Sequence, residues 1–253
     1  MPLIRKYDHL FFDLDNTLWD FDVNARLTMQ GAVHKLKLQD QITDFISFFN
    51  FFDQTNGRLW ELYRKQEIRQ QELIWKRFDI IIGHFGLTGV KPEDFNRIYL
   101  GMMPEFTSLV EGALETLDYL KAEGYQLHIL TNGLRHVQEK KVRNSLLSPY
   151  FKNIVASEDI CIPKPDKRIF RHALMQCNAK KQTSMMIGDT WETDIIGASR
   201  MGIDSVFFIK NEGKELLPCI KLAGAPKKYD FPETSPAKNH YLIKKLTDLK
   251  EIL

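Results

Sequence analysis

Apolar residues change their spacing along this chain, and the change predicts two kinds of structure. Residues 8–12, D-H-L-F-F, are too few for a helix, are mostly aromatic or aliphatic and are followed by turn-forming polar residues, which predicts a buried strand. From about Phe21 to Met103, apolar residues instead recur every three or four positions, with Pro92 as the one proline. This spacing predicts amphipathic helices, clearest at 23–38, 42–52 and 59–78.

Beyond Val110 short apolar runs alternate with helical patterns. Strands are predicted at 125–130, 153–156, 184–187 and 205–209, and helices at 111–123, 134–147, 166–177 and 193–201, the first and last closed by Gly124 and Gly202. Residues 210–239 are rich in Pro, Gly and Lys and are expected to be irregular, before a short strand near Tyr241 and a last helix. This order predicts an α/β fold, a doubly wound parallel sheet built from 1–18 and 108–253, with an all-helical insertion at 19–107.

Composition narrows the functional classes. The 253 residues are 43% hydrophobic and 27% charged, as in ordinary globular proteins, and 35 basic against 33 acidic residues exclude a nucleic-acid polymer or a membrane surface as the expected partner. Met1–Arg5 lacks the apolar core of a signal peptide, so a cytoplasmic location is expected. Cys161, Cys177 and Cys219 have no C-x-x-C spacing, which predicts neither disulfides nor a zinc site.

Polar side chains follow several of the predicted strands. They are Asp13 and Asp15, Thr131 and Asn132, Lys164 in I-P-K-P, and Asp189 with Asp194 in G-D-T-W-E-T-D. Ligands of open parallel sheets bind beyond the carboxyl ends of the strands, so these groups are expected to converge. Carboxylates suit a hard cation, and a hydroxyl and an ammonium suit a phosphoryl group.

Each of these residues alone has an ordinary structural explanation. Lys164 could be a solvated surface lysine, Thr131 or Asn132 a turn residue or helix cap, and Asp194 an acidic residue favoured at a helix N-terminus. The combination of all of them carries the functional interpretation.

The combination resembles the haloacid dehalogenase (HAD) superfamily, whose motifs are D-x-D-x-T, a Thr or Ser after the second strand, a Lys, and G-D-x-x-x-x-D. All four occur here in that order, between about residues 8 and 209. The resemblance implies a Rossmann-like core and identifies the insertion as the family's cap. It also implies an Mg²⁺-dependent phosphatase that works through an aspartyl-phosphate.

Roles carried over by position follow from this resemblance. It implies that Asp13 is the nucleophile, and that Asp15 is the general acid and base and binds the metal through its carbonyl. Asp189 is implied as a further metal ligand, and Asp194 as a residue that orients metal-bound waters or Lys164. The residues implied to hold the phosphoryl oxygens are Thr131, the Asn132 amide and Lys164.

Further details resemble the pyrimidine 5'-nucleotidase subgroup: F-F-D-L-D-N-T-L-W-D-F-D, L-W-x-L-Y with a downstream R-F, L-T-N-G and K-P-D-K-R-I-F. They imply nucleoside 5'-monophosphates as substrates. One departure is that R-K-Q-E follows L-W-x-L-Y where the family usually has a glycine-containing turn. Of the aromatics that could stack on a base, Phe21, Trp60, Tyr63, Trp75 and Phe78, helical spacing favours a core position, and Trp19 and Phe21 follow the first strand most closely.

Other functions stay open at this point. Dehalogenases of the superfamily characteristically lack an acid two residues after the nucleophile, so Asp15 favours phosphate chemistry. Sugar-phosphate phosphatases and phosphosugar mutases share both aspartates. A non-enzymatic phospho-receiver module also places acids, a Thr and a Lys around a phosphorylated Asp, but such modules are about half this length and have no D-x-D acid.

Overall fold

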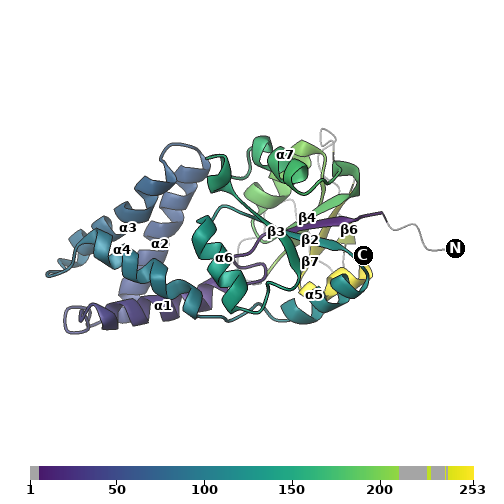
Figure 1. Ribbon diagram of the computed structural model, residues 1–253. Coiled ribbons are helices and arrows are strands. Elements are labelled where there is room, and N and C mark those ends of the chain that lie inside the picture. Colours follow the sequence, from purple (N-terminus) through teal and green to yellow (C-terminus); the bar gives the residue numbers. More distant parts are fainter. Residues whose placement is uncertain (1–5, 211–226, 229–236, 238) are drawn as a thin grey trace. The chain divides into compact units, whose positions relative to one another are not determined.

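A mostly parallel β-sheet forms the centre of one of the two compact units into which the chain divides. The structure is a computed structural model that describes residues 6–210, 227–228, 237 and 239–253. The sheet belongs to the unit formed by Met1–Asp20 and Leu109–Leu253, and the helical unit is Phe21–Ser108 (Figure 1).

Within the described residues, the order of strands in the sheet is β3-β2-β1-β4-β5-β7-β6. The strands are β1 (His9–Phe12), β2 (Gln126–Thr131), β3 (Phe151–Ala156), β4 (Ser184–Gly188), β5 (Asp204–Phe208), β6 (Lys227–Lys228) and β7 (His240–Ile243). All neighbouring pairs are parallel except β6 with β7. Strand β1 lies between β2 and β4, with Phe12 opposite Ile129 and Ile187. The carboxyl ends of these strands therefore meet at one edge, and the predicted α/β fold is confirmed.

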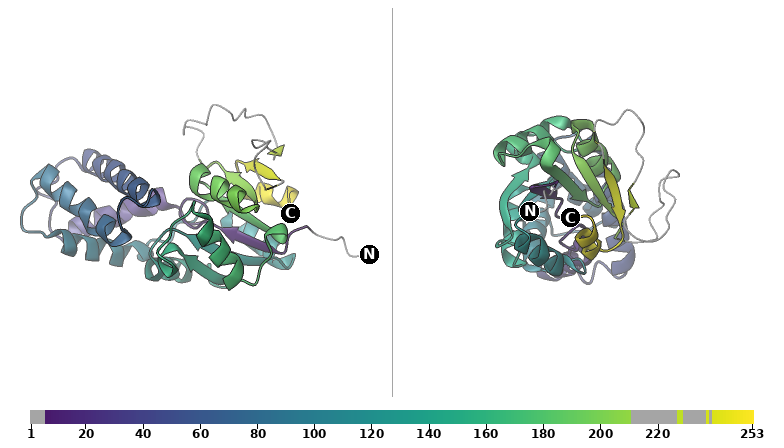
Figure 2. Two further views of the ribbon diagram at one scale, coloured as in Figure 1. Left: turned by 90° about the horizontal axis from the view of Figure 1, so that it is seen from above. Right: turned by 90° about the vertical axis from the view of Figure 1, so that its right-hand side faces the viewer.

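Helices cover both faces of this sheet (Figures 1 and 2), with α7 above it and α5 below it in Figure 1. The helical elements of the unit are α5 (Ala113–Ala122), α6 (Arg135–Asn144), η2 (Ser157–Asp159), α7 (Lys167–Gln176), η3 (Lys181–Thr183), η4 (Trp191–Ile196), α8 (Gly197–Met201) and η5 (Leu246–Glu251). One core cluster joins Phe11 and Met186 of the sheet to Phe170 of α7 and Ala198 of α8. Burial of this apolar area is the main force that holds the layers together.

Several local predictions are confirmed and others are wrong. Gly124 and Gly202 both have a φ of 80°, as expected of residues that close α5 and α8. The helix predicted at 193–201 instead begins as a π-helical turn, η4, and becomes α-helical only at Gly197. The predicted last helix is a 3₁₀ helix, η5. Strand β6 lies in the stretch expected to be irregular, most of which falls outside the described residues.

The helical unit is built from helices α1 to α4, as its three-to-four spacing predicts. They are α1 (Phe21–Lys35), α2 (Phe45–Arg64), α3 (Gln70–Phe85) and α4 (Pro92–Met102), followed by the 3₁₀ turn η1 (Met103–Glu105). The helix predicted at 42–52 starts later, because the Asp44 side chain caps Ser47 N–H at 3.1 Å, and it continues unbroken to Arg64. Phe52, Phe78 and Tyr99 lie in contact and are fully buried.

The departure after L-W-x-L-Y is explained by the end of α2. Gln66 has a φ of 60°, a left-handed conformation that glycine adopts most easily. The N–H groups of Gln66 and Glu67 donate to Tyr63 and Leu62 carbonyls, both at 2.9 Å, which is the hydrogen-bond pattern of a Schellman motif. The turn expected from glycine is therefore made here by glutamine.

Half of the aromatic residues considered for base stacking lie in the core, and Phe21 and Trp60 are half-buried. Trp19 and Phe78 are fully buried and Tyr63 is 5% exposed, whereas Trp75 is 44% exposed. The structural explanation therefore holds for the first three. Among the described residues, Cys161 and Cys177 are free thiols, and Cys219 lies outside them. No helix in the described part of the chain has the length and apolarity that a membrane span requires.

A histidine pair is buried inside the sheet. His9 Nδ1 lies 3.0 Å from His128 Nε2, and the Asn153 side chain lies 3.1 Å from His128 Nδ1. Burial, with smaller contributions from the neighbouring His9 and Lys152, lowers the pKa of His128 to about 4. The folded protein therefore holds a neutral imidazole across mildly acidic pH.

This pair makes stability dependent on pH. An unfolded histidine takes up a proton below a pH of about 6.5, but folded His128 does so only near 4, so the unfolded state binds more protons in this window. We expect His128 to remove about 3 kcal/mol of the free energy of unfolding as the pH falls from 6.5 to 4. His128→Gln should lose that dependence in urea denaturation, whereas the exposed His136→Gln should keep it. Equal pH slopes in His128→Gln and the wild type would contradict this origin.

Candidate active site

The loop after β1 places the first two aspartates on separate sides of the strand end. Asp13 is still hydrogen-bonded into the sheet, its N–H donating to the Ile187 carbonyl at 2.9 Å. The chain then reverses through Asn16, which has a φ of 60°, and the N–H of Trp19 returns to the Leu14 carbonyl at 2.9 Å. Asparagine tolerates this left-handed conformation better than most residues, so the D-N-T sequence favours the turn.

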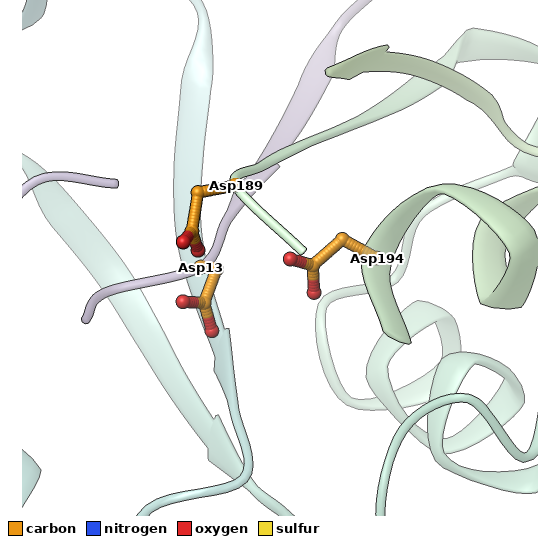
Figure 3. Close-up of side chains that lie close together, drawn as sticks. All are labelled: Asp13, Asp189 and Asp194. Carbon is orange, nitrogen blue, oxygen red and sulfur yellow. The ribbon is translucent and has the colours of Figure 1, made fainter. Parts of the chain in front are cut away.

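Three carboxylates meet beyond the strand ends. Ligand oxygens of Asp13, Asp189 and Asp194 lie within 4.8 Å of one another, and Figure 3 shows the Asp189 and Asp194 side chains directed toward Asp13. Asp13 follows β1 and Asp189 follows β4, its neighbour in the sheet. The convergence predicted from the strand ends is therefore present for these residues.

Lys164 lies at the centre of this group and is not a surface lysine. Its side chain is 2% exposed, and Nζ donates to Asp13 Oδ1 at 2.6 Å and to Asp194 Oδ1 at 2.7 Å. A further hydrogen bond of 2.7 Å goes to the Leu130 carbonyl at the end of β2. The ammonium therefore joins groups from three neighbouring segments at the sheet edge.

Asn132 holds the Lys164 segment in place. Its Oδ1 accepts from the Lys164 N–H at 2.8 Å, and its Nδ2 donates to the Lys164 carbonyl at 3.1 Å. The neighbouring Thr131 Oγ1 accepts from the Gly133 N–H at 3.0 Å and from Gln138 Nε2 at 2.8 Å. Thr131 therefore keeps its own hydroxyl proton as a donor.

The close charges shift the pKa values of this group. Burial raises the pKa of Asp13 well above its ordinary value; the Lys164 ammonium opposes the rise, and Asp194, Asp189 and Asp15 add to it. Burial alone would lower the pKa of Lys164, but Asp13 and Asp194 reverse that effect and raise it. Lys164 is thus held as a cation among acids that repel one another.

The main chain at Gly188 and Thr190 lies in close contact with the Asp194 side chain. A Cβ at Gly188 would lie 2.3 Å from Asp194 Oδ2, so this position has no room for a side chain. The same Oδ2 accepts from the Thr190 N–H at 3.1 Å, while Oδ1 accepts from Lys164. Both oxygens of Asp194 are thus bound by donors, and the π-helical turn η4 carries the carboxylate back toward Lys164.

Asp15 differs from the other predicted acids, because its carboxylate points to helix α6. Asp15 Oδ1 accepts from Lys141 Nζ at 2.6 Å, and Oδ2 accepts from Gln138 Nε2 at 2.9 Å. Sequence reasoning missed both donors. Their signal was the spacing of three positions, which places them on the same face of α6 close to the T-N-G motif.

The arrangement has the parts that phosphoryl transfer requires. An ionisable carboxylate lies beside an ammonium, further carboxylates adjoin it, and a second acid two residues away is held separately. Of the predicted residues, Asp13, Lys164, Asp189 and Asp194 form one cluster, and Thr131 and Asn132 border it through Leu130 and the Lys164 main chain. Gln138 bonds both Thr131 and Asp15 and so connects the two parts.

Known proteins resemble this chain over most of its length. It is 31% identical over 205 residues to pyrimidine 5'-nucleotidase PynA of Streptococcus pneumoniae, covering 80% of this chain and 84% of that protein. It is 30% identical over 199 residues to pyrimidine 5'-nucleotidase YjjG of Escherichia coli, covering 78% and 84%. A glyceraldehyde 3-phosphate phosphatase of Pyrococcus furiosus is 28% identical over 215 residues, covering 84% and 85%.

The fold also matches a solved structure. The crystal structure of the HAD-hydrolase YfnB from Bacillus subtilis, bound to magnesium, superposes with a TM-score of 0.80 at 24% identity and covers 98% of this chain and 99% of that one. The family model described as haloacid dehalogenase-like hydrolase matches residues 10–208, and this match confirms the resemblance predicted from the motifs. The chain therefore belongs to the haloacid dehalogenase-like hydrolase family.

Proposed function

We propose that this hydrolase cleaves phosphomonoesters through an aspartyl-phosphate on Asp13, with nucleoside 5'-monophosphates as its substrates. The observation that carries the proposal is the contact of Asp13 Oδ1 with the buried Lys164 ammonium at 2.6 Å, beside Asp189 and Asp194. The relatives described above, two nucleotidases and one sugar-phosphate phosphatase, support this class of reaction.

The proposed reaction has two steps. A carboxylate oxygen of Asp13 attacks phosphorus, the bond from phosphorus to the ester oxygen breaks, and Asp15 gives a proton to the leaving oxygen. Asp15 then takes a proton from water, whose oxygen attacks the phosphorus of the aspartyl-phosphate. The bond from phosphorus to the Asp13 oxygen breaks, which regenerates the Asp13 carboxylate and releases inorganic phosphate. The negative charge of the incoming phosphoryl group disfavours the first approach, and Lys164 reduces that repulsion at the nucleophile.

The other predicted residues bind the phosphoryl oxygens or orient Lys164. The Thr131 hydroxyl and the main-chain amide of Asn132 are proposed as donors to phosphoryl oxygens. Asp194 orients Lys164 through the 2.7 Å contact, and its second oxygen is fixed by Thr190 N–H. These contacts support the proposal that Asp194 acts on the lysine rather than as a metal ligand.

The donor set fits Mg²⁺. The group brings together three carboxylates and one ammonium. Burial raises the pKa of Asp13 most, repulsion from the other carboxylates adds to the rise, and a divalent cation would relieve that repulsion. Asp13, Asp189 and the main-chain carbonyl of Asp15 are the proposed ligands. Bound there, Mg²⁺ would neutralise charge on the phosphoryl oxygens and the nucleophile.

The substrate class rests on the nucleotidase relatives, together with the L-W-x-L-Y, L-T-N-G and K-P-D-K-R-I-F stretches. A sugar-phosphate phosphatase is the second candidate, favoured by the relative that acts on glyceraldehyde 3-phosphate. A phosphosugar mutase is a further alternative, because both aspartates would be retained. The assignment of the helical unit as a cap and of its substrate contacts stays a prediction.

A panel of phosphomonoesters with and without metal tests the proposal. Phosphate release is expected with Mg²⁺ from pyrimidine and purine nucleoside 5'-monophosphates, and much more slowly from hexose phosphates. EDTA should reduce turnover by about 10²-fold or more, and excess Mg²⁺ should restore it, because the cation neutralises charge that the transition state develops.

Each part of the panel has a result that would contradict one part of the proposal. Equal or faster rates on hexose or triose phosphates would replace the nucleotidase by a sugar-phosphate phosphatase. Isomerised instead of dephosphorylated glucose 1-phosphate would indicate a mutase. Full activity in EDTA would contradict the role of Mg²⁺ while leaving covalent catalysis to be decided by Asp13 itself.

A further inference from the structure

We propose that Lys141, assisted by Gln138, is a positioning residue that fixes the Asp15 carboxylate for proton transfer to the leaving group. The inference rests on the proposed phosphomonoester hydrolysis and adds an assignment for helix α6 (Arg135–Asn144). The starting observation is a buried lysine whose ammonium pairs with the Asp15 carboxylate.

The ion pair between Lys141 and Asp15 is strongly asymmetric in exposure. Lys141 Nζ lies 2.6 Å from Asp15 Oδ1, and the lysine side chain is 2% exposed while that of Asp15 is 29% exposed. An ammonium withdrawn from water requires a nearby negative charge. Asp15, in contrast, is exposed enough to be solvated without Lys141. The ion pair is therefore not needed to solvate the Asp15 carboxylate, and its effect on Asp15 is to fix the position of the carboxylate.

Lys141 has little freedom to leave this position. Its Nζ lies 3.9 Å from the centroid of the Trp19 ring, and Trp19 is fully buried. The main chain of Trp19 is itself held by Leu14 and by a bridge to Leu109. The lysine therefore sits between a fixed aromatic face and the carboxylate, in a cation–π contact that favours this one rotamer.

Gln138 supplies the second contact, to the other oxygen of Asp15. Its Nε2 donates to Asp15 Oδ2 at 2.9 Å and to Thr131 Oγ1 at 2.8 Å. Donors on both oxygens fix the rotation of the carboxylate as well as its direction. The contact depends on Gly133, because a Cβ there would lie 2.4 Å from Gln138 Nε2. The glycine of the T-N-G motif thus makes room for this amide.

If Lys141 positions Asp15, its loss should have a kinetic effect that loss of a merely buried lysine would not have. A general acid displaced by about 1 Å loses much of its effect, whereas attack by Asp13 is unaffected. A leaving alkoxide needs the proton, but a p-nitrophenolate leaves at neutral pH without one. Because kcat/KM includes the steps up to cleavage of the ester bond, the two kinds of substrate should respond differently to loss of Lys141.

The experiment compares Lys141→Met with the wild type on p-nitrophenyl phosphate and on the best alkyl phosphomonoester of the panel. We expect kcat/KM for the alkyl ester to fall about 100-fold, and that for p-nitrophenyl phosphate to change less than about threefold. Lys141→Arg should recover most of the loss, because a guanidinium also donates to a carboxylate. The exposed neighbour Lys140→Met is the matched control and should behave as the wild type.

A second variant keeps the test informative if Lys141→Met folds poorly. Gln138→Met keeps the ion pair and removes the donor to Asp15 Oδ2, and it should show the same selective loss, about tenfold, on the alkyl ester. Equal losses on both substrates, or no loss in either variant, would overturn the positioning role. A wild type inactive toward both substrates would overturn the hydrolase proposal and this inference with it, which separates the two failures.

Discussion

Asp13→Asn is expected to reduce phosphate release by about 10⁴-fold or more, because the amide that replaces the carboxylate cannot act as the charged nucleophile. The effect should be large in kcat on every phosphomonoester, including p-nitrophenyl phosphate, since both kinds of substrate require the same attack. Brief reaction followed by acid quenching and mass spectrometry should detect a phosphoryl adduct on the wild type and none on the variant.

Two features make this test specific to Asp13. The substitution is nearly isosteric, and an asparagine oxygen can still accept the hydrogen bond that Lys164 Nζ donates at 2.6 Å. Asp118→Asn is the matched control, because Asp118 belongs to the same unit, is exposed and accepts from Tyr150 Oη at 2.7 Å. Retention of near-normal turnover in Asp13→Asn, with the control unchanged, would exclude covalent catalysis at this position.

The sheet and the acidic cluster could be predicted because both depend on short-range patterns. A run such as L-F-F followed by Asp13 marks a buried strand and its end, and parallel strands align their ends at one edge. The joint prediction for Asp13 and Asp189 follows from this rule, since β1 and β4 are neighbours. Where the chain turns is encoded locally, and the spatial neighbours then follow from topology.

The contacts of Asp15 could not be predicted in the same way. Lys141 is apart from Asp15 by more than a hundred residues, and its direction depends on how α6 packs on the sheet. In sequence it is one lysine among several on a strongly charged helix, where a solvated position is the usual outcome. The structure shows that it is instead buried, with its ammonium beside the Trp19 ring.

Local irregularities in the helices could also not be predicted from the periodic spacing of apolar residues. The π-helical turn η4 has the same apolar spacing as the start of an α-helix, and the difference arises from contacts of Asp194 with Lys164 and Thr190. Gln66 takes the place expected of a glycine because the Schellman hydrogen bonds at the end of α2 compensate for its left-handed conformation. In both places tertiary or capping contacts override propensity.

Lys164→Met is expected to lower both stability and turnover. The substitution removes the ammonium from Asp13 and Asp194 and leaves two buried carboxylates close together without a counter-charge. Breaking a buried ion pair from one side costs about 3–5 kcal/mol of the free energy of unfolding. Asp13, the proposed nucleophile, also loses the charge that reduces repulsion with the phosphoryl group, so kcat should fall about 10³-fold.

Metal dependence separates this electrostatic effect from a simple packing defect. Mg²⁺ bound between Asp13 and Asp189 would replace part of the lost positive charge, so it should raise the Tm of Lys164→Met more than that of the wild type. Lys250→Met is the matched control: the pair that Lys250 forms with Glu115 is largely exposed, and its loss should cost less than about 1 kcal/mol. If Lys164→Met unfolds at the wild-type urea concentration, or if Mg²⁺ stabilises both proteins equally, the acidic group does not depend on Lys164 for its charge balance. A selective stabilisation by Mg²⁺ would instead indicate that Lys164 and the cation together neutralise the negative charge around Asp13.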